Sequence, residues 1–186
     1  MTRKRRLFLI IIIVVGVVFL LRKRIEWAFY DLQEYYNVSN SLVWDENRKL
    51  KWSDFKYDAT KKYADNIDAR VGISQRYHIA DKIEFHSNTL FLPEKSFMTD
   101  TTDRTSLRIA QARFDLCEVY RLKLEEKVTK LRKNTSEVTT NTLKKYNELY
   151  YDKFEKEWSN FMNLEYKEVD KRLSDLEARI KTELKN

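Results

Sequence analysis

The feature that most constrains this chain is an apolar run near its N-terminus. Residues 7–21 read LFLIIIIVVGVVFLL, fifteen residues without a charge, and basic clusters flank the run on both sides. As a helix, with about 1.5 Å per residue, the run spans about 22 Å, less than the roughly 30 Å hydrocarbon core of a bilayer. Basic side chains at its ends must therefore reach toward the headgroups, helped by an interfacial tryptophan. We predict a membrane anchor over residues 1–30, with the flanks Arg3, Lys4, Arg5, Arg6, Arg22, Lys23, Arg24 and Trp27.

A cleaved secretory signal is the main alternative to an uncleaved anchor. It has the same basic start, but a small-residue cleavage pattern should follow the apolar run, and the basic residues 22–24 follow it instead. A buried helix of a soluble protein is the weakest alternative, because a globular core does not need a helix that is apolar all round. The positive-inside bias is weak, and we expect an inside N-terminus. The domain then lies outside the cytoplasm, on the periplasmic face in a bacterium with two membranes.

The net charge argues against a nucleic-acid partner. The chain has 36 Lys and Arg against 29 Asp and Glu, a formal charge of +7. Seven basic residues flank the anchor, so residues 25–186 hold 36 minus 7, or 29, basic residues against the same 29 acids. The predicted domain thus lacks the net positive field on which phosphate binding depends.

The rest of the chain predicts one α+β domain, with a small antiparallel sheet followed by long α-helices. Residues 31–48 have mixed polarity and are interpreted as a linker with some helix, and residues 49–186 as the domain. Residues 50–55, 69–80 and 82–92 are rich in β-branched and aromatic residues or alternate in polarity, which predicts three strands. Gly72 in the second strand marks a bulge or a close backbone approach, or is incidental.

Two helical regions are predicted after the strands. Asp103 can cap a helix over residues 104–132, whose apolar residues recur at four-three spacing with Arg121 as the polar interruption. A polar turn at 133–141, with Ser136 or Thr139 as a cap, leads into a second helical region that continues to the end. Its last part, 160–186, repeats apolar residues at four-three spacing for under three heptads. This pattern indicates packing against the domain, the simpler interpretation, or a short coiled coil.

Several short motifs recur here in the order that they have in a known family. They are Trp52-Ser53-Asp54-Phe55, then Ala69 through Gly72 and Ile73, then Ser96 and Phe97, and then the helix residues Gln111, Phe114, Asp115, Leu116 and Glu118. Over residues 49–132 the chain thereby resembles the bacterial secreted domain-of-unknown-function family nine-twenty-two, whose members look like small zinc-dependent proteases. A later stretch of that family, Tyr-Asp…Thr-x-His-Gly, is echoed only by Tyr151 and Asp152. Where its Thr, His and Gly would fall, this chain has Glu155, Glu157 and Trp158.

The metal-binding residues of the resembled family are missing. Its helix carries His-Glu-x-x-His, in which two imidazoles one turn apart bind Zn²⁺ and the glutamate activates the bound water. Alignment on Phe-Asp-Leu places Ile109 and Arg113 at the histidines and Ala110 at the glutamate. Ile and Ala have no ligand atom in their side chains, and a guanidinium has no lone pair to donate. We expect a degenerate former site at Ile109, Ala110, Arg113, Asp115 and Glu118, where Arg113 makes a buried ion pair in place of the metal.

No other catalytic site stands out, so we predict neither catalytic nor metal-binding residues and no cofactor. His78 and His86 are the only histidines; with Glu84 they could meet across a sheet, but surface or cross-strand roles are commoner. Cys117, the single cysteine, can form no intrachain disulfide and is expected to be buried. No glycine-rich phosphate loop and no serine-centred elbow is present.

These observations predict a membrane-anchored, catalytically inactive protease-like domain that acts in binding or assembly at the cell envelope. Its expected partners are the membrane and an envelope protein. One alternative is a structural protein that forms homo-oligomers through its C-terminal helices. A second alternative is a hydrolase with a relocated active site built from acidic residues.

Overall fold

The computed structural model describes residues 11, 28, 31–60, 66–79, 83–131, 138–163 and 168–185, and of His78 only the backbone. The chain divides into two compact units, Met1–Tyr36 and Asn37–Asn186. The predicted anchor at 7–21, apart from Ile11, and its flanking residues lie outside the described part. Among the described residues, no helix is both long enough and apolar enough to cross a membrane.

The larger sheet of the second unit is antiparallel, in the order β1-β5-β4. It consists of β1 (Leu42–Val43), β5 (Ile83–Phe91) and β4 (Val71–Ile79). The long strands β4 and β5 confirm two of the three predicted strands. Successive side chains of a strand point to opposite faces, so an alternation of apolar residues places them on one buried face. Gly72 pairs regularly with Leu90, and a Cβ atom added to it would contact nothing within 4 Å. Gly72 therefore marks neither a bulge nor a close approach.

A second, smaller sheet has the order β2-β6-β3. In it β6 (Phe97–Met98) pairs in parallel with β2 (Lys56–Tyr57) and antiparallel with β3 (Ile67–Asp68). The prediction of a strand at 50–55 is wrong, because Trp52–Asp54 form a 3-10 turn, η1. The Asp54 carboxylate accepts a hydrogen bond from the Lys51 amide at 2.8 Å and closes this turn, which the near-alternating apolar pattern did not reveal.

The segment predicted as a linker, 31–48, takes part in the fold. Residues 31–39 are helical, in keeping with the helix expected there. Strand β1 follows, with Leu42 opposite Phe91 and Val43 opposite Leu90. The linker interpretation is therefore wrong for residues 42–43. A strand of two residues is too short to show a period in the sequence.

The predicted first helix is present as α2 (Arg104–Leu131). The Asp103 carboxylate accepts the amides of Thr105 and Ser106 at 2.9 and 3.3 Å, as expected of an N-cap. Phe114, Leu124 and other apolar residues at four-three spacing are fully buried. The helix contacts β4 and β5 as well as α3 and α4, so it forms the centre of the second unit.

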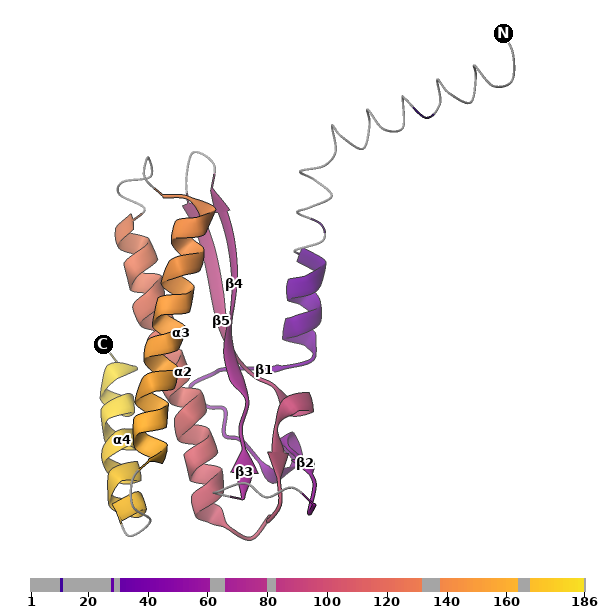
Figure 1. The fold of residues 1–186 in the computed structure, drawn as a ribbon, viewed down its shortest axis with the longest axis vertical. Coiled ribbons are helices and arrows are strands. Elements are labelled where there is room, and N and C mark those ends of the chain that lie inside the picture. The colour runs from indigo at the N-terminus through magenta and orange to yellow at the C-terminus, as the bar shows by residue number, and fades with distance from the viewer. Residues whose placement is uncertain are drawn as a thin grey trace. The chain divides into compact units, whose positions relative to one another are not determined.

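The second helical region is two helices, α3 (Thr140–Met162) and α4 (Val169–Glu183). Thr139 caps α3, since its hydroxyl accepts the Thr142 amide at 3.2 Å. Within residues 37–186, α4 packs on α2 away from the long strands, whereas α3 contacts both α2 and β4 (Figure 1). Leu173, Leu176 and Ile180 of α4 are buried in the main core with α2. This burial confirms the packing interpretation of the C-terminal apolar pattern.

Candidate functional site

One pocket of the second unit lies over the N-terminal half of α2, where the resembled family has its metal-binding motif. It has a volume of about 430 Å³ and we call it the Arg113 pocket. Its wall includes three of the predicted former-site residues, together with residues of β3 and of the end of α3. The lining residues are Ile67, Asp68, Ala69, Arg70, Ile109, Ala110, Arg113, Trp158, Ser159 and Met162.

Arg113 makes the ion pair that the sequence predicts, and its partner is Glu155 of α3. Its Nη2 atom lies 2.8 and 3.1 Å from the two carboxylate oxygens of Glu155. The guanidinium carbon lies 5.4 Å from the ring centre of Trp158 and 5.7 Å from that of Phe154. These contacts offset the cost of placing a charge where only 15 % of its side chain is exposed. Arg113 Nε is buried and has no hydrogen-bond partner among the described residues.

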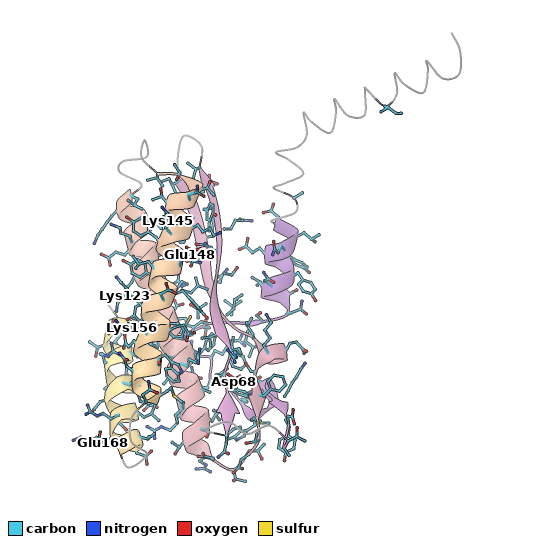
Figure 2. The ribbon with its side chains drawn as sticks, viewed as in Figure 1. Asp68, Lys123, Lys145, Glu148, Lys156 and Glu168 are labelled. Atoms are coloured by element: carbon cyan, nitrogen blue, oxygen red, sulfur yellow. The ribbon has the colours of Figure 1, made fainter. Side chains whose placement is uncertain are left out.

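Ile109, Ala110 and Arg113 give the pocket no side chain suited to metal ligation. Ile109 and Ala110 are 5 % and 1 % exposed and contribute only hydrocarbon. The neighbouring Asp68, labelled in Figure 2, pairs with Arg70 at 2.9 Å (Oδ2 to Nη2). Among the residues that the structure describes, no group of three or more His, Cys, Asp or Glu could hold a metal ion.

The hydrogen bonds of β6 indicate which backbone groups of β3 point away from β6. The amides of Lys56 and Asp58 each donate at 2.9 Å, to the carbonyl oxygens of Ser96 and Met98 respectively. Ser96 and Met98 thus present their backbone groups to β2. Because neighbouring residues of a strand point their backbone groups in opposite directions, Phe97 presents its own to β3.

The same alternation applies along β3. The Thr99 amide donates to the Asn66 carbonyl at 2.9 Å, so Asn66 and Asp68 face β6. Ile67 and Ala69 consequently direct their amides and carbonyls away from β6. In the described part of the chain β3 is the last strand of its sheet, and residues 67–70 line the pocket. Ile67 and Ala69 are 8 % and 5 % exposed, so this edge lies within the wall of a pocket that the charged residues Asp68, Arg70 and Arg113 also line.

Asp115 lies on the opposite side of α2 from Arg113. Its Oδ1 atom accepts hydrogen bonds from Trp44 Nε1 and from Gln111 Nε2, both at 2.8 Å. Gln111 in turn accepts the Leu50 amide at 2.8 Å. Burial raises the pKa of Asp115, although the two hydrogen bonds oppose this rise. The side chains of Gln111 and Asp115 therefore fasten the segment after β1 to the helix.

This side of α2 also borders a second groove, of about 550 Å³. Trp44, Asp115 and Glu118 line it together with residues of α4 such as Ile180 and Lys181. The structure therefore does not bring all five predicted site residues into one site. Ile109, Ala110 and Arg113 share a pocket, whereas Asp115 and Glu118 border another surface.

Glu118 holds Arg121 in place, and Arg121 links α2 to the sheet. It is 4 % exposed, and its two carboxylate oxygens accept from Arg121 Nε and Nη2 at 2.8 and 2.7 Å. Arg121 also donates to Ser87 of β5 at 3.2 Å and to Glu125 at 2.6 Å. The polar interruption in the apolar face of the predicted helix is thus one half of a buried ion pair.

Cys117 and the two histidines are the remaining candidates that the sequence offers. Cys117 is fully buried, and burial raises the pKa of its thiol, which disfavours the nucleophilic thiolate. The sheet register places His78 opposite Glu84 and His86 opposite Arg76. The two histidines are therefore not direct cross-strand partners.

Glu155 and Trp158 stand in the sequence only as departures from the resembled family, and their contact with Arg113 was not predicted. The contact joins residues 42 and 45 positions apart on two helices, and a single sequence contains no signal for such a pairing. Comparison with known proteins adds nothing to the assignment, because no family model, no curated protein and no solved structure matches this chain.

Proposed function

We propose that this chain is a membrane-anchored, catalytically inactive protease-like domain that binds an extended segment of another protein at the cell envelope. The proposal includes the distant relationship to family nine-twenty-two and the single membrane helix over residues 7–21. It places the N-terminus inside and the domain outside the cytoplasm, on the periplasmic face. The bound segment occupies the Arg113 pocket.

The ion pair between Arg113 and Glu155 is the observation that carries the proposal. In the resembled family the helix motif binds the metal through its two histidines. In this chain Arg113, at the position of the second motif histidine, contacts Glu155 and Trp158 from the corresponding later stretch. A cation thus occupies the position of the second motif histidine, and the carboxylate of Glu155 pairs with it. Such a pair supports retention of the fold without the metal.

The environment of the pocket supports binding of a polypeptide. The bound segment lies beside the outer edge of β3, where Ile67 and Ala69 are buried in the pocket wall, so addition of a strand there requires this wall to open. Ile109, Ala110 and Trp158 offer apolar surface for a side chain of that segment. A bound strand would gain hydrogen bonds and bury apolar area in one step, which is the usual basis of strand addition.

Metal analysis separates this proposal from an active hydrolase. We expect less than about 0.1 zinc per chain in the full-length protein purified in detergent, because Arg113 repels a cation at the former motif. His78→Ala/His86→Ala should leave that content unchanged. One zinc per chain that is lost with the two histidines would mean that a relocated site exists and would contradict the proposal.

Peptide selection tests the pocket itself. The probe is a phage library of random seven-residue peptides panned on the full-length protein in detergent. Ser159 is exposed at the rim of the pocket, so Ser159→Trp should block it without disturbing the core, whereas exposed Asn160→Trp is the matched control. Selected peptides should lose at least about ten-fold in affinity for Ser159→Trp and little for Asn160→Trp. Equal binding to both variants would place the peptides elsewhere and remove the support for this pocket.

A further inference from the structure

Residues 31–39 form a helix that presents large apolar and aromatic side chains to the outside. Leu32, Tyr35 and Tyr36 are 65 %, 72 % and 68 % exposed. At positions i, i+3 and i+4 they share one face of the helix. Side chains of this size at such exposure form an apolar and aromatic stripe rather than a solvated polar face.

The stripe continues a pattern that begins at the predicted anchor. In the sequence, Ile25, Phe29, Leu32 and Tyr36 follow one another at spacings of four, three and four residues. This is the period of an apolar helix face. The helix begins within ten residues of the basic cluster that ends the apolar run. Only a short length of chain therefore separates the stripe from the bilayer in which residues 7–21 are proposed to lie.

The composition around the helix indicates which lipid chemistry suits it. Residues 25–47 contain five acids and no lysine or arginine. An anionic surface would repel this segment, so attraction must come from apolar burial and from the interfacial preference of tyrosine. A zwitterionic headgroup region meets both conditions.

We propose that the helix at 31–39 lies in the interface of the bilayer, with Leu32, Tyr35 and Tyr36 among the headgroups of zwitterionic lipids. This inference rests on the proposed anchor. It adds a second attachment to the membrane, which fixes the point where the chain leaves the lipid and enters the folded unit.

Single-cysteine labelling of the full-length chain tests this inference, because Cys117 is fully buried and should not react. Leu32→Cys and Tyr35→Cys carry an environment-sensitive nitrobenzoxadiazole probe in phosphatidylcholine vesicles. Asn37→Cys is the matched control, since Asn37 is exposed and lies about 140° around the helix from Leu32 at about 100° per residue. Unsubstituted protein measures any labelling of Cys117.

We expect probes at positions 32 and 35 to fluoresce at least about two-fold more strongly than the probe at 37, and to be quenched by nitroxide-labelled lipids. Equal, unquenched emission from all three positions in chains that float with the vesicles would overturn the inference while leaving the anchor intact. A failure to float would instead contradict the anchor. Strong emission at 32 and 35 that nitroxide lipids do not quench would indicate contact with a second protein copy and would also overturn the inference.

Discussion

Arg113 and Asp115 are two positions apart on α2, but only Arg113 makes an ion pair in the described part of the chain. Arg113 is held by the carboxylate of Glu155 and by two aromatic rings, so its charge is compensated. Asp115 accepts hydrogen bonds from the neutral donors Trp44 and Gln111, and the charge of Lys49 has a smaller effect on its pKa. Burial raises the pKa of Asp115, and the charged carboxylate is the form that burial disfavours.

The raised pKa of Asp115 predicts a pH-dependent stability. The folded chain binds the proton of Asp115 more tightly than the unfolded chain, so stability from this group falls as the pH rises through the folded pKa. Asp115→Asn keeps an oxygen that accepts from Trp44 and cannot ionise. The free energy of unfolding of this variant minus that of the original chain should therefore increase from acidic to neutral pH.

Urea denaturation followed by tryptophan fluorescence at several pH values provides the measurement. Exposed Asp175→Asn is the control, and its difference from the original chain should not vary with pH in this way. If Asp115→Asn were instead less stable by a constant amount at every pH, ionisation of Asp115 would not be the cause. The loss of stability would then come from an altered hydrogen bond with Trp44.

At the scale of elements, α2 organises the second unit and α4 completes its core. The apolar side chains of α4 that could form a coiled-coil seam are already buried against α2. Polar contacts add to this packing, since Arg108 Nη2 of α2 lies 2.7 Å from Glu177 Oε2 of α4. Within the described chain α4 thus behaves as a packed helix, and its apolar stripe is not available to a second copy.

Leu173→Ala tests this role of α4. Leu173 is fully buried, so loss of its side chain should cost about 2–4 kcal/mol of unfolding free energy, whereas exposed Arg172→Ala should cost little. Light scattering in detergent should give the same mass for the variant and the original chain. A change in oligomeric state with only a small loss of stability would support the coiled-coil alternative.

At the scale of the whole molecule, the boundary of the folded unit differs from the one that composition suggests. The second compact unit begins at Asn37 and includes β1 and Trp44, whereas the sequence predicts a domain that begins at residue 49. A chain of residues 37–186 keeps the pairing of β1 with β5 and the hydrogen bond from Trp44 to Asp115. A chain of residues 49–186 loses both.

We therefore expect 37–186 to fold cooperatively and 49–186 to be less stable by about 2–4 kcal/mol, from lost hydrogen bonds and apolar burial. Circular dichroism during thermal unfolding measures this difference. Equal midpoints for the two chains would show that β1 and Trp44 contribute little. Failure of 37–186 to fold would contradict the division into two units.

The sequence by itself determined the elements that are long or locally capped. Helix α2 and strands β4 and β5 follow from hydrophobic periods over many residues, and Asp103 and Thr139 cap their helices through bonds to residues two or three positions away. The charge at Arg113 and its lack of a metal-ligand atom were also evident, because they depend on residue type alone.

Tertiary structure alone decided the short strands and the partners of the site residues. Strands β1, β2, β3 and β6 have two residues each, too few to show a period, and they exist because a neighbouring strand supplies hydrogen bonds. Likewise Arg113 meets Glu155, and Asp115 meets Trp44, across large sequence separations. Such pairings depend on how α2 packs against the rest of the chain, and packing is a property of the folded molecule.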